Sequence, residues 1–210
     1  MIDLYTWGTP NGRKVSVMLE ELGLKYNVHK VDISKGEQHK PEFLKISPNN
    51  RIPAIVDSEG PGGKPMSVFE SGAILIYLAE KAKSKLLPTD PRRRVETLEW
   101  LMWQMGGVGP MFGQAHHFMF NPPEDVPYGK KRYHDEARRL YKVMNTRLGK
   151  TKYLAGDDYT IADIATYPWV QRHPRHQVDL GDYPNVKRWF DEISKRPAVE
   201  KGMQVPFYNV

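Results

Sequence analysis

The chain contains no cysteine among its 210 residues. Disulfide bonds, thiolate-ligated metal sites and a nucleophilic thiol supplied by the protein are therefore excluded. No apolar run approaches the roughly 20 residues that a membrane-spanning helix needs, so we expect no membrane association. The opening segment MIDLYTWG has no basic stretch followed by a long apolar one. We therefore expect no secretory signal and a cytoplasmic location.

Strong charge of one sign is also missing. The 31 basic and 25 acidic residues give a net charge of +6, and the 40% hydrophobic fraction is that of a globular protein. A small positive charge favours anionic small molecules or nucleic acid. The basic clusters at residues 92–94 and 130–132 are short, which is typical of solvated helix faces. We expect no nucleic-acid partner, and we keep a nucleic-acid-binding protein as a minor alternative.

The first part of the chain alternates between strand and helix patterns. The spacing of apolar residues and turn signals predicts a β-α-β-α-β-β-α order. Helical crossovers favour parallel strand pairs, whereas the short SEGPGGKP link between the last two strands permits an antiparallel pair. We predict an α/β domain with a mixed sheet over residues 1–83. The expected strands are 2–6, 26–31, 51–56 and 66–69, and the expected helices are 11–22, 41–46 and 71–80.

The second part of the chain carries helical patterns almost throughout. A linker at residues 83–91 precedes an aromatic-rich helix at 92–105, and 128–148 is a long amphipathic stretch. Thr160 and Asp163 have the spacing of a capping box, which indicates a structural helix start. We predict an all-helical domain over residues 91–210.

Five short strings appear in a specific order: TPNGRK from residue 9, LEE from 19, PEF from 41, SPNNRIPAI from 47 and FESGAI from 69. Together they resemble the Nu class of the cytosolic glutathione transferases. That class includes bacterial glutathione-dependent disulfide reductases and is related to fungal prion-type nitrogen regulators. The resemblance covers essentially the whole chain. It implies a thioredoxin-like N-terminal domain, an all-helical C-terminal domain, glutathione as cosubstrate, no metal, and a homodimer.

Glutathione must be held as a thiolate to react at neutral pH. Thr9 and Asn11 lie where the first strand meets the first helix, and both can donate a hydrogen bond to sulfur. The helix dipole also favours an anion there. We predict Thr9 and Asn11 as the catalytic residues. The alternative is that Asn11 only caps the helix while Thr9 makes a turn, and we expect Tyr5 to be packed within its strand.

The remaining glutathione contacts follow from the resemblance. It implies that Ile52 offers its backbone to the cysteinyl group next to a cis peptide at Pro53; an ordinary edge-strand proline is the alternative. Ser71, as a helix cap, would bind the γ-glutamyl carboxylate, and Glu70 would pair with the α-ammonium. Further contacts are expected from Gln38, Arg51 and Arg132, and from Gln104 toward a neighbouring subunit's site. Arg132 has the alternative of being a solvated helix charge.

Aromatic and histidine residues offer weaker candidates. Trp7, Phe118 and Phe120 are expected to line a pocket for an electrophile, although aromatic residues are more often core residues. His116 and His117 are adjacent, so they point in different directions on a helix, and we expect no metal site.

The sequence thus predicts a glutathione-dependent thiol–disulfide oxidoreductase of the glutathione transferase type. A bound glutathione thiolate would attack a disulfide, and a second glutathione would resolve the product because the enzyme has no cysteine. One alternative is that the same site mainly conjugates glutathione to electrophiles. Another is a non-enzymatic binding or regulatory module on the same fold.

Overall fold

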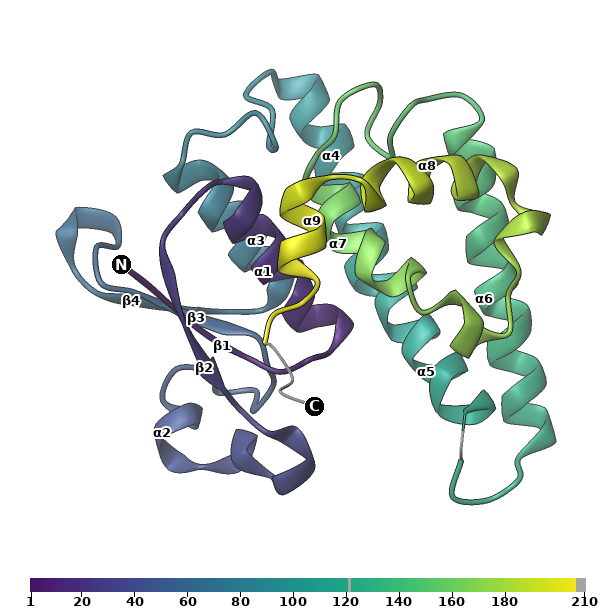
Figure 1. Ribbon diagram of the computed structural model, residues 1–210, viewed down its shortest axis with the longest axis horizontal. Coiled ribbons are helices and arrows are strands. Elements are labelled where there is room, and N and C mark those ends of the chain that lie inside the picture. The colour runs from purple at the N-terminus through teal and green to yellow at the C-terminus, as the bar shows by residue number, and fades with distance from the viewer. Residues whose placement is uncertain (121, 207–210) are drawn as a thin grey trace. The chain divides into compact units, whose positions relative to one another are not determined.

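The computed structural model describes residues 1–120 and 122–206 (Figure 1). The chain forms two compact units. The first comprises Met1–Ser84 together with the segment from Arg196, and the second comprises Lys85–Lys195. No helix within the described residues is long and apolar enough to cross a membrane.

The first unit is built on a four-stranded mixed sheet. Its strands are β1 (Ile2–Thr6), β2 (Tyr26–Lys30), β3 (Ala54–Asp57) and β4 (Met66–Phe69), in the spatial order β2-β1-β3-β4. The β1–β2 pair is parallel, and the β1–β3 and β3–β4 pairs are antiparallel. The predicted mixed sheet is therefore confirmed. β3 begins three residues later than predicted, directly after Pro53, because proline has no N–H to donate to a ladder.

Helices cover both faces of this sheet. α1 (Pro10–Glu21) and α3 (Ser71–Lys81) pack together and contact β1 and β3. On the other face, Phe43 of α2 (Pro41–Leu44) packs with Ala54 and Tyr5. The arrangement is thioredoxin-like, as predicted. Tyr5 packs as expected, since its ring stacks on His29 at a centroid distance of 4.5 Å. Three short 3-10 helices, Ile33–Lys35, Glu37–His39 and Pro61–Gly63, complete the unit.

The starts of α1 and α3 correct one alternative, that Asn11 caps α1, and one prediction, that Ser71 caps α3. Thr9, not Asn11, is the N-cap of α1: its backbone is extended, and its hydroxyl accepts a hydrogen bond from the Gly12 N–H at 3.2 Å. Pro10 suits the first helical position, because a backbone N–H at that position has no acceptor within the helix and its absence therefore costs nothing. In α3 the N-cap position is occupied by Glu70, and Ser71 is the first helical residue rather than the cap.

The C-terminal helix α9 (Pro197–Gly202) packs against α1 within the first unit. The Ser16 hydroxyl donates to the Gly202 carbonyl at 2.7 Å, and Arg196 forms two hydrogen bonds with Glu21 at 2.7 and 2.8 Å. A Cβ on Gly202 would lie 2.5 Å from the Val17 Cα, so only glycine permits this approach. The expected second domain, 91–210, thus includes a segment that the structure assigns to the first unit. The other predicted domain limits stay a prediction.

The second unit is helical. It contains α4 (Pro91–Trp103), a π-helical turn (Gln104–Val108), α5 (Gly109–Met119), α6 (Pro127–Leu148), α7 (Ile161–Val170) and α8 (Pro184–Ser194), with 3-10 turns at His173–His176 and Leu180–Asp182. All ten residues of α7 are buried. A helix that is apolar on every side belongs in the centre of a core. The neighbouring helices α4, α5 and α8 contact it.

The predicted capping box at the start of α7 is confirmed. The fully buried Asp163 carboxylate accepts hydrogen bonds from the Thr160 N–H and the Leu154 N–H, both at 3.0 Å. It also accepts from the Trp189 indole N–H at 2.8 Å. Burial raises the pKa of Asp163, while these hydrogen bonds act in the opposite direction. One carboxylate therefore joins the start of α7 to a preceding loop and to α8.

Replacing Asp163 with alanine is expected to lower the free energy of unfolding of the protein by at least about 3 kcal/mol. The physical reason is that three buried N–H donors lose their acceptor. Chemical denaturation followed by circular dichroism measures this change.

Asp158→Ala is the matched control. Asp158 pairs with Arg93 on the surface, where both side chains are more than half exposed. Its loss is expected to cost less than about 1 kcal/mol. Equal destabilisation by the two substitutions would contradict the role assigned to Asp163.

Candidate functional site

The register of the sheet brings three loops of the first unit to one edge. Tyr5 of β1 pairs with Ala54 of β3, and Ala54 pairs in turn with Phe69 of β4. Neighbouring strands lie about 4.8 Å apart. The loop after β1, the segment before β3 and the residue after β4 therefore meet within about two strand spacings. Thr9, Pro53 and Glu70 are the residues found there.

The start of α1 forms the first part of this edge. Because the Thr9 hydroxyl oxygen accepts from Gly12, its own proton remains available to a ligand. Asn11 is half-buried in the first turn of the helix. A Cβ on Gly12 would lie 2.4 Å from the Trp7 carbonyl oxygen, so glycine lets the helix begin directly against the end of β1. A helix N-terminus held in this way favours an anionic atom.

The second part is the segment that leads into β3. The expected cis peptide between Ile52 and Pro53 is present, and Pro53 is buried. The buried Ser47 hydroxyl donates to the Arg51 carbonyl at 2.8 Å, and Asn50 has a positive φ of 48°. These features fix the backbone just before the proline. Pairing of Ile52 with an extended ligand stays a prediction.

The third part is the strained junction between β4 and α3. Glu70 has φ 69° and ψ 114°, a conformation that costs a non-glycine residue about 1–3 kcal/mol. Its side chain is exposed and does not cap the helix, while its carbonyl accepts from the Ile74 N–H at 2.9 Å. Ser71 follows directly and is 4% exposed. Strain of this kind is retained mainly at ligand sites, which favours a binding role for this junction.

Lys14 belongs to the same region, and the sequence analysis missed it. Its side chain is 1% exposed, and its ammonium donates to the Ser71 hydroxyl oxygen at 3.3 Å. Burial lowers the pKa of Lys14 to about 7, and the charge of Glu70 opposes that shift. A signal was present in the sequence. Lys14 stands four residues before Met18, on the side of the helix that the apolar pattern predicts to be buried.

Two predicted glutathione contacts lie in loops of the first unit. Gln38 sits in the 3-10 turn Glu37–His39, after the end of β2 that lies beside the end of β1. Its Oε1 atom is buried and has no hydrogen-bond partner among the described residues. Arg51 is exposed. Both roles stay predictions.

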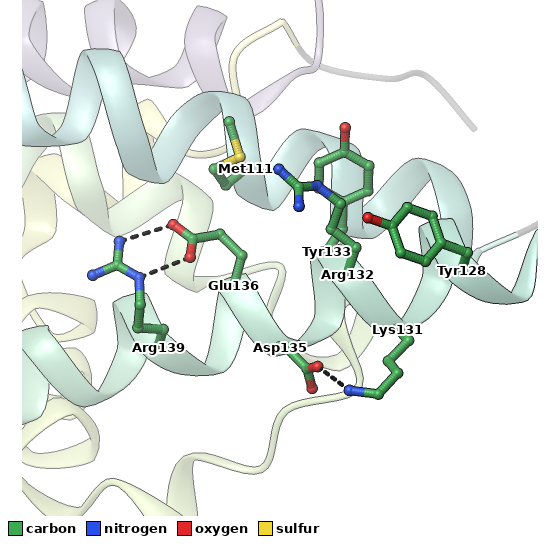
Figure 2. Close-up of a pocket in the computed structure, with 8 residues that line it drawn as sticks. All are labelled: Met111, Tyr128, Lys131, Arg132, Tyr133, Asp135, Glu136 and Arg139. Carbon is green, nitrogen blue, oxygen red and sulfur yellow. Dashed lines mark hydrogen bonds and ion pairs between the residues drawn. The ribbon is translucent and has the colours of Figure 1, made fainter.

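The second unit contains an open pocket of about 770 Å³ beside α6 (Figure 2). It is lined by Met111, Tyr128, Lys131, Arg132, Tyr133, Asp135, Glu136 and Arg139. Lys131 pairs with Asp135, and Arg139 holds Glu136 through two hydrogen bonds that lower the pKa of that carboxyl. Among the described residues, Arg132 is the pocket cation that forms no ion pair. An anionic group is therefore the natural ligand for it.

The aromatic residues predicted to line an electrophile pocket are not gathered in one unit. Phe118 stacks on Tyr133 at a centroid distance of 5.1 Å. Phe120 is 53% exposed, and the Arg175 guanidinium lies 4.6 Å from its ring centroid. Trp7 belongs to the first unit. Their shared role stays a prediction.

Two further expectations concern the second unit. Gln104 is fully buried in the π-helical turn, so it offers no surface to a ligand in this conformation, and its approach to a neighbouring subunit's site stays a prediction. Within residues 1–120 and 122–206, no group of three or more His, Asp or Glu side chains is arranged to hold a metal ion.

A thioredoxin-like unit with a cis-proline at its sheet edge, combined with an all-helical unit, defines a protein of the glutathione transferase type. Residues 1–80 match the family profile "Glutathione S-transferase, N-terminal domain", and residues 108–197 match "Glutathione S-transferase, C-terminal domain". The disulfide-bond oxidoreductase YfcG of Escherichia coli (strain K12) is 53% identical over 97% of this chain and 94% of its own length. The chain belongs to the glutathione S-transferase family.

Solved structures of glutathione transferases are also similar to this chain. A glutathione transferase family member from Pseudomonas fluorescens pf-5, with two glutathione bound, superposes with a TM-score of 0.93 at 47% identity, covering 98% of this chain and 93% of the other. A glutathione transferase from Pseudomonas putida, with one glutathione disulfide bound per subunit, also has a TM-score of 0.93, at 45% identity and with 98% and 91% coverage.

Glu70→Gly is expected to be more stable than Glu70→Gln by about 1 kcal/mol. Both substitutions remove the carboxylate, but only glycine relieves the positive φ, and that relief exceeds the flexibility that glycine adds to the unfolded chain. Thermal and chemical denaturation of the two variants measure the difference. A less stable glycine variant would show that the junction is not strained.

Proposed function

We propose that this chain is a glutathione-dependent disulfide-bond reductase. The supporting observation is the sheet edge where the start of α1, the cis-Pro53 segment and the Glu70–Ser71 junction meet in a chain that has no cysteine. Such a site has to take its reactive sulfur from a bound thiol. The name of YfcG, a disulfide-bond oxidoreductase, supports the same reaction class.

In this proposal Thr9 and Asn11 hold the glutathione sulfur as a thiolate. The Thr9 hydroxyl donates its free proton to sulfur while its oxygen continues to cap α1. The Asn11 amide donates a second hydrogen bond, and the N-terminal end of the helix adds a favourable field. Hydrogen bonds to the charged form lower the pKa of the thiol, so more of it is ionised at neutral pH.

The rest of the tripeptide would be held by the neighbouring segments. Ile52, before Pro53, would pair its backbone with the cysteinyl residue as an added strand does. Glu70 would bind the α-ammonium, and Ser71 with the first N–H groups of α3 would bind the γ-glutamyl carboxylate. Gln38 and Arg51 would take the glycyl end.

Arg132 would contribute from the second unit. Its lack of an ion pair among the described residues makes it the available cation of its pocket, where Lys131 and Arg139 are already paired. We propose that Arg132 binds a carboxylate of glutathione. Trp7, Phe118 and Phe120 would contact the non-glutathione part of the substrate.

The proposed reaction has two exchange steps. The bound thiolate attacks one sulfur of a substrate disulfide, forming a mixed disulfide while the second substrate sulfur leaves as a thiolate and takes a proton from solvent. A second glutathione thiolate then attacks the glutathione sulfur of the mixed disulfide. The products are glutathione disulfide and a second substrate thiol. The substrate gains two electrons, and two glutathione molecules lose one each.

Asn11→Ala is expected to raise the pKa of bound glutathione by about one unit and to lower kcat/KM at neutral pH about tenfold. The reason is the loss of one hydrogen bond to a charged sulfur. Ultraviolet absorbance of the thiolate across a pH titration and a hydroxyethyl-disulfide assay give the two measurements.

Lys25→Met, at an exposed position outside the site, is the control and should match the wild type. An aryl-halide conjugation assay run in parallel separates disulfide reduction from conjugation to electrophiles. Two negative results together would refute this function: no turnover in either assay, and no binding of glutathione detected by calorimetry at millimolar concentration. The protein would then be a non-enzymatic binding or regulatory module.

We also propose that the protein is a cytoplasmic homodimer. Val95 and Met102 of α4 are 57% and 51% exposed and stand seven residues apart, so they share one helix face. Exposed apolar side chains on one face favour contact with a second protein surface.

Replacing Val95 and Met102 together with glutamate is expected to shift the protein from dimer to monomer, because the charged groups would be buried in the dimer interface without partners. Light scattering with size-exclusion chromatography measures the mass. Ile33→Glu, at an exposed apolar residue of the first unit, should leave the dimer intact. A monomeric wild type would refute the proposal.

A further inference from the structure

A second pocket of the helical unit lies between α4 and α6, and the proposed function assigns it no role. Its volume of about 450 Å³ is within the range of small-molecule sites. Trp100 lines it from α4, and its other lining residues come from α6 and from the turn that follows α6. All of them belong to Lys85–Lys195, so the pocket is formed within one unit.

One face of α6 supplies the wall of this pocket. Arg139, Val143 and Arg147 stand four residues apart along the helix, and Lys142 and Thr146 do so as well. Side chains at this spacing lie next to one another on a helix surface. The pocket therefore has a continuous wall in which one apolar side chain stands among basic ones.

The charge of the pocket is positive. Its lining within the described residues includes four basic side chains and no Asp or Glu. Each of the two arginines is paired with one glutamate outside the pocket: Arg139 with Glu136, and Arg147 with Glu96. Lys142 and Lys150 are exposed, and neither forms an ion pair with any residue of 1–120 or 122–206. Two lysine charges are thus available to an anionic ligand.

Trp100 gives the pocket an aromatic surface that is held in place. The Arg147 guanidinium carbon lies 5.4 Å from the centroid of its ring, and the Trp103 ring meets it edge-on at a centroid distance of 5.1 Å. Arg147 is itself fixed, because its Nε donates to the Leu154 carbonyl at 2.8 Å and it pairs with Glu96. The indole remains partly exposed. A fixed ring with an open part suits contact with a planar ligand.

The apolar face assigned to the dimer lies elsewhere on α4. Trp100 stands five residues after Val95 and two before Met102. At about 100° per residue it points at least about 140° away from both side chains. The pocket is therefore not the surface that the dimer proposal assigns to a second copy.

We propose that this pocket binds a planar aromatic molecule that carries an anionic group, such as an aromatic carboxylate or sulfonate. The ring would contact Trp100 and Val143, and the anionic group would pair with Lys142 or Lys150. The Thr146 hydroxyl could donate a hydrogen bond to the same group. The proposal does not rest on the proposed function, because no glutathione is needed at this pocket.

The probe is 2-naphthalenesulfonate, and titration calorimetry on the full chain measures its Kd. We expect a Kd on the order of 100 μM that rises with salt concentration. Methanesulfonate lacks the ring and 2-naphthalenemethanol lacks the charge, so each should bind at least about tenfold more weakly. Equal affinity for the sulfonate and either of these compounds would overturn the proposal.

Replacing Lys142 and Lys150 together with glutamine is expected to raise the Kd of the probe about tenfold, because two charge contacts are lost. Both lysines are exposed, so the fold should be retained. The matched control replaces Lys85 and Lys195 with glutamine. These two exposed lysines lie in the same unit and do not line the pocket. Equal weakening by the two double variants would show a general charge effect and would contradict a site at this pocket.

Trp100→Leu tests the aromatic contact and should also raise the Kd about tenfold or more. If this variant does not fold, the lysine variant still decides the outcome. Light scattering on the lysine variant should give the wild-type mass. A lower mass would mean that the pocket is an interface between copies of the chain, which also overturns the proposal.

Glutathione disulfide separates this pocket from the proposed glutathione site. Arg139 also lines the Arg132 pocket (Figure 2), so the two pockets adjoin along α6. The Kd of the probe should be unchanged at saturating glutathione disulfide, and displacement of the probe would place it in the glutathione site instead. If the wild type binds no glutathione, the proposed function fails while the lysine variants still test this pocket.

Discussion

The candidate site depends on strand register. Because Tyr5, Ala54 and Phe69 lie side by side across the sheet, the loop after β1, the cis-Pro53 segment and the Glu70 junction are fixed at one edge. Sliding any of these strands by one residue would turn its side chains to the opposite face and separate the three segments. The apolar residues that hold the register, such as the fully buried Leu4 and Ile55, therefore support the site without belonging to it.

Two helices begin at this edge, and both starts are unusual. α1 begins against the end of β1 because Gly12 has no Cβ to clash with Trp7. α3 begins directly after the strained Glu70, and its first residue, Ser71, accepts a hydrogen bond from the buried Lys14. Strain and a buried charge both oppose folding. Their occurrence together at one helix start favours a binding role for that start.

The second unit is stabilised by hydrogen bonds to one buried carboxylate. The buried Asp163 joins the start of α7 to Leu154 and Trp189, which come from separate segments. A polar group of this kind specifies how helices meet, because only one arrangement satisfies all its donors. Arg132 then stands on α6 in a pocket whose other basic residues are paired. The buried Asp163 and the pocket residue Arg132 thus lie on different helices of this unit.

Apolar periodicity and turn signals in the sequence were sufficient for the order of strands and helices along the chain, the mixed sheet, the helical second unit and the capping box, because these patterns are local. The absence of cysteine likewise determined that any reactive thiol must come from a ligand. Tertiary structure alone decided that Thr9 rather than Asn11 caps α1, that Glu70 is strained, and that residues 196–206 join the first unit. It also decided the contact between Lys14 and Ser71, which lie 57 positions apart. The physical reason is that burial, close approach and hydrogen bonding between distant residues depend on how elements pack, and periodicity within one element carries no information about them.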